Sequence, residues 1–255
     1  MIVGIVTALM ILFGGGNVES PYIIPKFDKL ITSEISSKER EKEVKDLIKT
    51  YKTHWKAFKK YEKGFQKDYK KSYGEMDTDS ESLSEQLEQF QLKQEELNGK
   101  LIPIRMEVMD LVTHEEWKGA IDHYFQIPEK KKEKKSKKEL KAAIKQNKKL
   151  SSIRNKIINN LETTEDQNSV YQAFESFESS LTEISYNEQD ALKEIIHSIA
   201  DKEISETELT QLMENYLSFS IELSKAAIDL RENIKGNLTT EDWDKVQKDL
   251  LKLID

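Results

Sequence analysis

The stretch "LVTHEEW", residues 111–117, returns 126 positions later as "NLTTEDW", residues 237–243. Each copy also has an arginine twelve residues before its tryptophan, Arg105 in the first and Arg231 in the second. A repeat at fixed spacing is the signature of a fold built from copied units. The recurrence therefore indicates either a repeated piece of the fold or a repeated site, and the chemistry of the residues decides between them.

The first copy has the chemistry of a helix start. If Thr113 is the N-cap, its hydroxyl accepts a hydrogen bond from the amide of Glu116, whose carboxylate reaches back to the cap amide, and together these form a capping box. Val112 precedes the cap, where it can pack on Trp117 as a hydrophobic staple. The acidic first turn also suits the positive end of the helix dipole. We therefore interpret the motif as structural.

The second copy repeats this scheme with Thr239 as the cap, Asp242 as a shorter box partner and Trp243. Capping does not explain Arg105 and Arg231, each of which could lie over the tryptophan face or pair with the acidic first turn. A repeated ligand site formed by arginine, acid and tryptophan is the alternative. The residues that carry either interpretation are Arg105, Thr113, Glu116, Trp117, Arg231, Thr239, Asp242 and Trp243.

The likeness extends well beyond the motif. When the chain is aligned with itself at the same offset, without gaps, apolar residues meet apolar residues along most of both copies. The pairs include Ile35 with Leu161, Val44 with Val170, Ile48 with Phe174, Tyr51 with Phe177, Phe58 with Ile184, Leu83 with Leu209, Leu97 with Leu223 and Ile104 with Leu230. Chance overlap of two helical periodicities is the alternative, and we interpret the pattern as an internal duplication.

Composition and periodicity both predict helices. The chain has 34% charged residues, 9 Gly and 4 Pro, a bias typical of long helices. Apolar residues recur every three or four positions, which is the stripe of an amphipathic helix. We predict long helices over about 37–73 and 80–111, and their equivalents in the second copy.

The fold class that follows is all-α, with an N-terminal membrane helix and two duplicated long-helix hairpin units that pack like coiled coils. The predicted layout is a transmembrane anchor or signal segment at 1–18, a tether loop at 19–32, a first helical repeat at 33–128, a Lys-rich bridging helix at 129–160 and a second helical repeat at 161–255.

The first eighteen residues contain no charged side chain. As a helix they would span about 27 Å, close to the hydrocarbon thickness of a bilayer. We predict an uncleaved, single-pass membrane anchor. A cleaved signal peptide, with Gly14 and Gly16 near the cleavage site, and an apolar helix buried in protein are the alternatives.

The flanks of this segment bear on orientation and assembly. Lysines follow the apolar run at Lys26, Lys29 and Lys38, which favours a cytoplasmic body by the positive-inside rule, with a periplasmic body as the alternative. Gly4 and Ala8 form a small-xxx-small pair through which two such helices could pack in lipid as a homo-oligomer.

The net charge of −7 is the sum of alternating blocks. Residues 37–73 carry about +7, 74–128 about −9, 129–149 about +8 and 161–255 about −14. Alternating blocks favour pairing between neighbouring helices, whereas a nucleic-acid-binding domain shows a general basic excess. We expect protein partners and no nucleic acid.

Motifs that would carry chemistry are absent from the sequence. There is no cysteine, so thiolate metal sites and cysteine nucleophiles are excluded. The four histidines, His54, His114, His123 and His197, lack metal-binding spacing, and no phosphate-binding loop or nucleophile elbow occurs. We predict no enzyme activity, no cofactor and no metal.

The motif resembles the LTxxQ pattern of small periplasmic helical-hairpin chaperones and stress sensors, in which Leu and Thr open a helix after a hairpin turn. The glutamine is missing, and Glu116 or Asp242 stands near its place. The likeness covers a few residues per copy and assigns no family. The function that we expect is a membrane-anchored helical scaffold or accessory subunit of a membrane or cell-envelope complex; the alternative is a periplasmic helical chaperone or envelope-stress sensor.

If the motif is structural, Thr113→Ala should lower the free energy of unfolding by about 1 kcal/mol, because it removes an N-cap. Denaturant melts of the variant and the wild type measure the difference. Loss of binding or activity with an unchanged melt would show that the motif is a ligand site.

Overall fold

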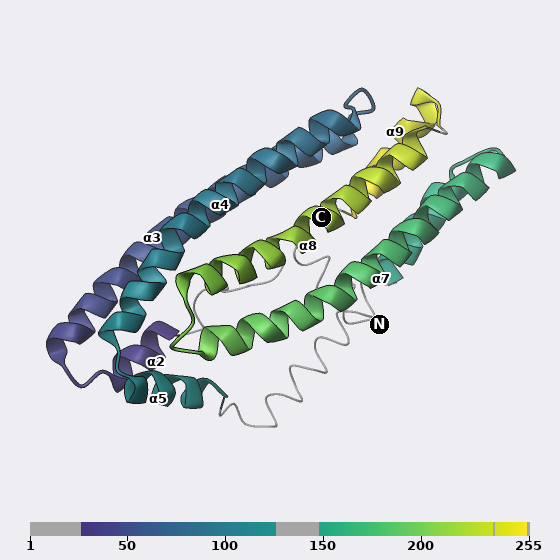
Figure 1. Cartoon of the computed structure of the whole chain (residues 1–255). Helices are drawn as coiled ribbons and strands as arrows, with labels where there is room; N and C mark the ends of the chain where they lie inside the picture. The colour runs from purple at the N-terminus through teal and green to yellow at the C-terminus, as the bar shows by residue number, and fades with distance from the viewer. Residues whose placement is uncertain (1–26, 126–147, 237, 254–255) are drawn as a thin grey trace.

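The computed structural model describes residues 27–125, 148–236 and 238–253 (Figure 1). This part of the chain is helical and contains no strand, so the all-α prediction is confirmed. Residues 148–159 are also helical. The named helices are α2 (Phe27–Glu34), α3 (Lys38–Gly74), α4 (Ser80–Leu111), α5 (His114–Phe125), α7 (Thr164–Ala200), α8 (Glu206–Lys235) and α9 (Thr240–Leu250).

The helices of the two halves begin at equivalent positions. α7, α8 and α9 each start 126 residues after α3, α4 and α5, respectively. At all six starts the side chain of the N-cap residue accepts a hydrogen bond from an amide of the first helical turn. The caps pair at the same offset, Ser37 with Thr163, Asp79 with Ser205 and Thr113 with Thr239. Each cap oxygen satisfies an amide that the helix leaves unpaired, so a single local residue marks where each of these helices begins.

Burial follows the same offset. At matched positions of the two halves both side chains are largely removed from solvent, as in Val44 and Val170, Ile48 and Phe174, Tyr51 and Phe177, Leu83 and Leu209, Leu97 and Leu223, Val108 and Ile234, and Trp117 and Trp243. The two halves therefore bury the same faces of equivalent helices.

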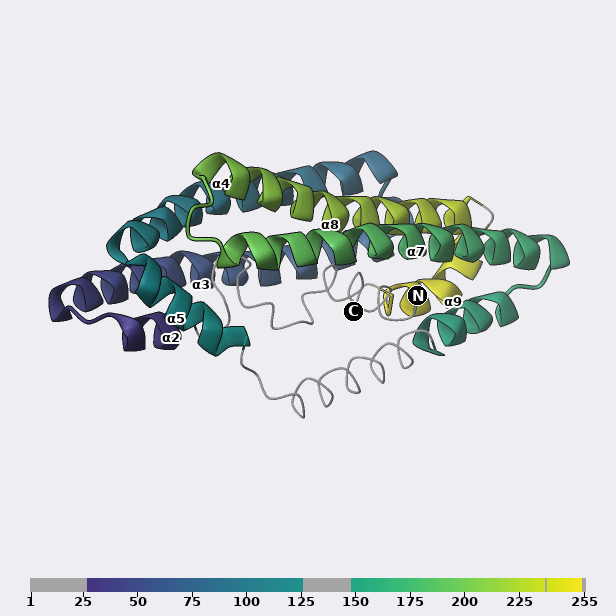
Figure 2. The same ribbon diagram turned by 60° about the horizontal axis from the view of Figure 1, so that its bottom comes forward.

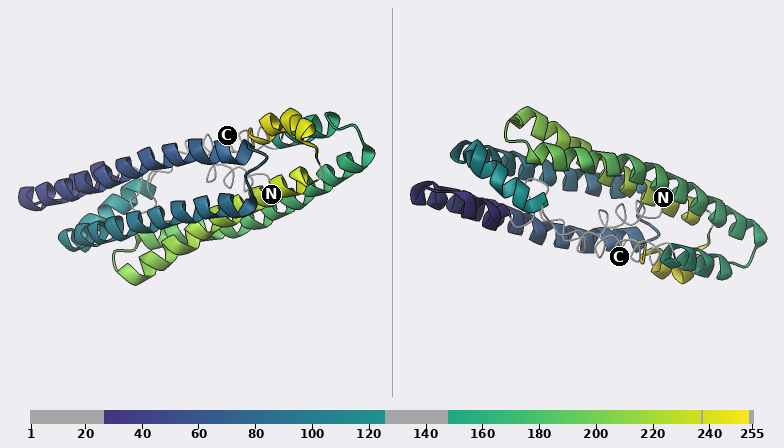
Figure 3. Two further views of the ribbon diagram at one scale, coloured as in Figure 1. Left: turned by 90° about the horizontal axis from the view of Figure 1, so that it is seen from above. Right: turned by 90° about the horizontal axis from the view of Figure 1, so that it is seen from below.

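Two helical hairpins lie side by side to form an elongated body (Figures 1 and 2). α3 packs on α4, α7 packs on α8, and α4 and α8 contact each other along the middle (Figure 3). α2 and α5 pack together at the end of the body where α7 turns into α8. α9 lies at the opposite end, next to the turn between α3 and α4.

Each half contributes to the core of the other. Tyr73 and Leu83, from the tip of the first hairpin, are buried in the core formed mainly by α7, α8, α9 and residues 148–161. Ile204, Leu209 and Met213, from the tip of the second hairpin, are buried in the core of the first half. This exchange of equivalent parts is the pattern of an isologous two-fold interface, here formed within one chain.

The region predicted as a tether loop at 19–32 is partly helical, because α2 begins at Phe27. Ile31 is fully buried and Ile35 nearly so, which gives this short helix an apolar face that packs on α5. The equivalent residues, Ile157 within the helical segment 148–159 and Leu161 just after it, are also buried. Each long hairpin is thus preceded by a short packed helix.

The predicted anchor at 1–18 lies outside the described residues, as do residues 19–26 of the tether and most of the Lys-rich bridge. Within the described ranges, no helix combines the length and the apolar character that crossing a membrane requires.

Because the cores are shared, the two halves should unfold together. Leu83→Ala should lower the free energy of unfolding by about 2 to 5 kcal/mol, as large-to-small core changes do, and should raise hydrogen exchange in α7–α9 as well as in α3–α5. Leu92→Ala, which alters an exposed residue of the same helix, should change stability by less than about 0.5 kcal/mol. Faster exchange confined to α3–α5 would contradict the shared core.

Candidate functional site

The two tryptophans of the repeated motif connect the halves of the molecule. The indole N–H of Trp117 donates to the carbonyl oxygen of Ala200 at 2.8 Å, and that of Trp243 donates to the carbonyl oxygen of Gly74 at 2.9 Å. Gly74 and Ala200 are themselves equivalent, since each is the last residue of the first long helix of its half. Each indole therefore supplies a donor to a helix C-terminus, where backbone carbonyls lack partners within the helix.

The motif arginines lie over the tryptophan rings. The Cζ atom of Arg105 is 4.0 Å from the ring centroid of Trp117, and that of Arg231 is 5.3 Å from the centroid of Trp243. Both arginines are almost fully buried, and burial lowers the pKa of Arg105 to about 9. Of the two roles that the sequence allowed, stacking on the indole is the one observed in both copies.

Arg231 also holds the turn between α3 and α4. Its Nε donates to the carbonyl oxygen of Tyr73 at 2.7 Å, and its Nη2 donates to the carbonyl oxygens of both Glu75 and Thr78. The guanidinium forms an ion pair with the neighbouring Glu232. A planar group with several donors suits such a set of carbonyls, which a lysine could not satisfy in the same way.

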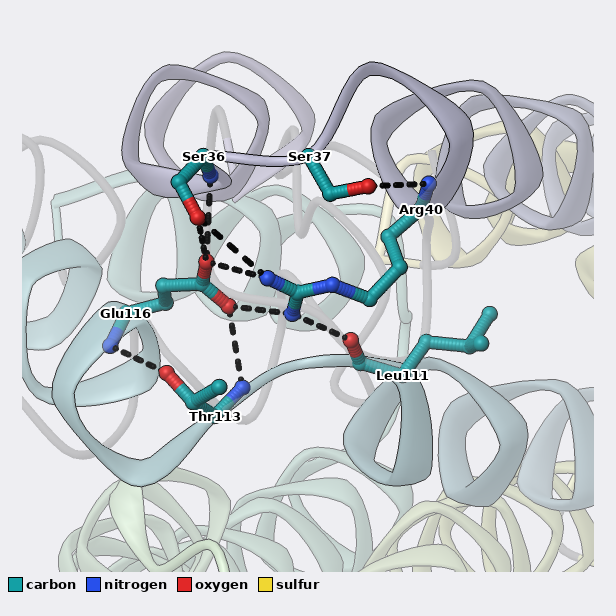
Figure 4. Close-up of polar contacts among 6 residues, drawn as sticks. All are labelled: Ser36, Ser37, Arg40, Leu111, Thr113 and Glu116. Carbon is teal, nitrogen blue, oxygen red and sulfur yellow. Dashed lines mark hydrogen bonds and ion pairs between the residues drawn. The ribbon is translucent and has the colours of Figure 1, made fainter.

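Thr113 and Glu116 form the predicted capping box. The amide of Glu116 donates to Thr113 Oγ1 at 3.2 Å, and the amide of Thr113 donates to Glu116 Oε2 at 3.0 Å (Figure 4). In the second copy the amide of Asp242 donates to Thr239 Oγ1 at 3.2 Å, and the Thr239 hydroxyl donates to the Asp242 carboxylate. The shorter side chain of Asp242 thus accepts a hydrogen bond from the hydroxyl of its cap residue, Thr239.

Glu116 has a further role that the sequence did not reveal. Arg40, at the start of α3, donates to both carboxylate oxygens of Glu116 at 2.7 and 2.8 Å, and to the carbonyl oxygen of Leu111 at 2.9 Å. The amide of Ser36 donates to the same carboxylate at 3.0 Å (Figure 4). One acidic side chain therefore joins the start of α5 to the segment between α2 and α3.

The electrostatics of this cluster favour the ionised acid. Hydrogen bonds from Arg40 lower the pKa of Glu116 to about 2 against the opposing effect of burial, and the amides of Thr113 and Ser36 lower it further. At the equivalent positions of the second half, Asp166 replaces Arg40 and Glu162 replaces Ser36. The cluster around Glu116 therefore belongs to the first half alone.

The rarity of arginine among the basic residues was a sequence signal for these contacts. Among 40 basic residues only Arg40, Arg105, Arg154 and Arg231 are arginine. All four make directed contacts, and Arg154 pairs with Glu178 at 3.1 Å and lies over the ring of Tyr171. A chain that uses lysine almost everywhere keeps arginine where its planar group is needed.

Two exposed histidines contact carboxylates. His114 Nε2 is 2.7 Å from a carboxylate oxygen of Glu203, and His123 Nδ1 is 3.1 Å from one of Glu34. Across the described residues, no group of three or more His, Asp or Glu side chains is arranged to hold a metal ion.

An open groove runs along one flank of α3, beside α2. Lysines dominate its lining, together with Ile48, Thr32, Thr53 and Ala57. For this basic block the sequence analysis predicted only charge pairing between neighbouring helices. The spacing of the lysines along α3 could be read from the sequence, but the position of Lys29 of α2 beside them could not.

Comparisons with protein-family models, with curated proteins and with solved structures give no match. The interpretation of these contacts therefore depends on their geometry.

The Glu116 cluster predicts a specific pH dependence. The pKa of Glu116 in the folded protein lies below the ordinary value near 4.5. The ionised Glu116 side chain therefore stabilises the fold above about pH 4.5, and this contribution is lost as the pH falls toward about 2. Glu116→Gln should destabilise the protein at neutral pH by about 2 kcal/mol, because it breaks the pair with Arg40. The difference between variant and wild type should shrink on acidification.

Urea melts between neutral pH and about pH 3 measure this difference. Glu115→Gln, which alters an exposed acid of the same turn, is the control and should differ from wild type by less than about 0.5 kcal/mol. A constant difference between Glu116→Gln and wild type across the range would exclude a stabilising ion pair.

Proposed function

We propose that the chain is a membrane-anchored helical scaffold, or an accessory subunit, of a membrane or cell-envelope complex, and that it acts through its surfaces without catalysing a reaction. One observation carries this proposal. Residues that recur in the sequence are engaged in structural contacts, and three of them, Trp117, Arg231 and Trp243, hold the two halves together through Ala200, the α3–α4 turn and Gly74, respectively. These contacts give the motif an architectural role.

The shape of the body supports a surface role. α3 has 37 residues, so it is about 55 Å long, and long helices of this kind present extended faces. A stable protein interface needs only about 800 Å² on each partner. Tyr171 and Leu92 are large apolar side chains that remain exposed on such faces.

Attachment to a membrane is proposed from the apolar sequence of residues 1–18. A single-pass anchor of that length would hold the body next to the bilayer, on the cytoplasmic or the periplasmic side. Packing through Gly4 and Ala8 would allow a homo-oligomer within the membrane.

We also infer that the two halves arose by duplication of one unit, a short helix followed by a long hairpin and a capped helix. The equal spacing of helix starts and caps supports this. The exchange of hairpin tips between the cores suits an ancestor that was a two-fold dimer of such units.

The proposal predicts that the tagged, full-length chain, crosslinked in cells and purified in mild detergent, brings down a protein partner in fixed stoichiometry. The chain should also remain with membranes after an alkaline wash. Thr239→Ala, which weakens a cap, should lower the melting temperature but retain the partner below that temperature, because the cap does not belong to the surface.

Two results would contradict the proposal. Release from membranes by the alkaline wash would remove the anchor. Suppression of client aggregation by the purified chain, without a fixed partner, would favour the alternative of a periplasmic chaperone or stress sensor.

A further inference from the structure

The lysines of α3 are concentrated on one side of the helix. Five of them, Lys45, Lys49, Lys52, Lys56 and Lys60, are separated by three or four residues, so they share one flank. All five are exposed. The row from Lys45 to Lys60 extends about 22 Å along the helix. Of the six acidic residues of α3, Glu39, Glu43, Asp46 and Asp68 lie on other sides of the helix, whereas Glu41 lies on the lysine side, four residues before Lys45.

α2 extends this row into a basic groove. Lys29 of α2 lines the groove together with the five lysines of α3. We call these six residues the lysine groove. Lys45 is paired with Glu41 of its own helix, yet the groove as a whole has a strong excess of positive charge.

The second half shows that the fold does not require these lysines. At the equivalent positions, 126 residues later, stand Asn155, Tyr171, Glu175, Glu178, Thr182 and Tyr186. None is basic and two are acidic. Over their whole length, α3 has 13 basic and 6 acidic residues, whereas α7 has 1 basic and 8 acidic. Two helices with equivalent buried faces thus carry opposite charge on their surfaces.

The position of the groove in the chain indicates its partner. The apolar residues 1–18 precede α2, and only residues 19–26 separate them from Phe27. Eight residues span at most about 29 Å when fully extended. If residues 1–18 lie in a bilayer, α2 and the adjacent groove are therefore held near the headgroups. The corresponding helix of the second half follows no such apolar segment, and its flank lacks the lysines.

We propose that the lysine groove binds the anionic phospholipid headgroups of the membrane in which residues 1–18 are anchored, so that α3 lies along the bilayer surface. This inference depends on the proposed membrane anchoring. Anionic headgroups attract lysines that come within a screening length of the surface. Each such lysine strengthens surface binding by about fivefold. The anchor makes this binding intramolecular, which raises the effective concentration of headgroups at the groove.

The experiment uses the full-length chain, whose lack of cysteine allows a single label at a chosen site. Thr53→Cys places a polarity-sensitive fluorophore in the groove, and Thr50→Cys places it on another side of the same helix. The two sites are matched, because both threonines are exposed and each hydroxyl donates to a backbone carbonyl four residues earlier. The vesicles are phosphatidylcholine alone, or phosphatidylcholine and phosphatidylglycerol in equal parts, with quenchers on the headgroups.

We expect flotation with both kinds of vesicle, because the anchor does not require anionic lipid. Quenching at position 53 should exceed that at position 50 only in the anionic vesicles, and it should disappear in about 1 M salt, where the screening length is about 3 Å. The triple variant Lys49→Glu, Lys56→Glu, Lys60→Glu should lose this quenching and still float. The control triple variant Lys118→Glu, Lys225→Glu, Lys248→Glu makes the same change in net charge at exposed positions elsewhere and should retain it.

Equal quenching at the two positions, or quenching that survives the groove variant, would overturn the inference while leaving the anchor in place. Binding of the groove to nucleic acid or to an acidic protein, without the lipid effect, would overturn it as well. Failure to float with phosphatidylcholine would refute the anchor. In that case, binding of the wild type to anionic vesicles that is lost in the groove variant would still support headgroup binding by the lysine groove.

Discussion

The hydrogen bond from each motif tryptophan to the end of a helix in the other half is the contact around which the molecule is organised. Trp117 bonds to Ala200, and Trp243 bonds to Gly74. A single bond of this kind contributes about 1 kcal/mol net. The contact as a whole is stronger, because each indole is also buried and covered by an arginine.

The two tryptophan contacts are reciprocal, and this makes each half of the molecule depend on the other. Since each half supplies a hairpin tip to the core of the other, neither core is complete without both halves. The constraint acts on buried positions and leaves the surfaces free to differ. The acidic residues of α7 and the lysines of α3 show this freedom, as does the Arg40–Glu116 pair, whose counterparts in the second half are Asp166 and Asp242. Differences between the outer faces are therefore where specific functions of the two halves are expected.

Much of the fold could be predicted from the sequence, because its signals are local. Caps such as Thr113, together with the spacing of apolar residues, indicate where the long helices begin and which faces are buried. α2 was missed because eight residues after a Gly- and Pro-containing stretch give a weak periodic signal. The partner of Glu116 was missed because Arg40 is 76 residues away, and sequence spacing predicts only neighbours on the same helix. The repeat also could not show whether its contacts lie within one half or between the two.

Exchange of the three tryptophan indole protons, followed by NMR on ¹⁵N-labelled protein, tests the reciprocal contacts most directly. Assignment by single Trp→Phe variants separates Trp117 and Trp243 from Trp55. The structure predicts that the protons of Trp117 and Trp243 exchange slowly and with similar protection, close to that of global unfolding, because both are released only when the halves separate. Rapid exchange of either proton in the folded protein would contradict this account.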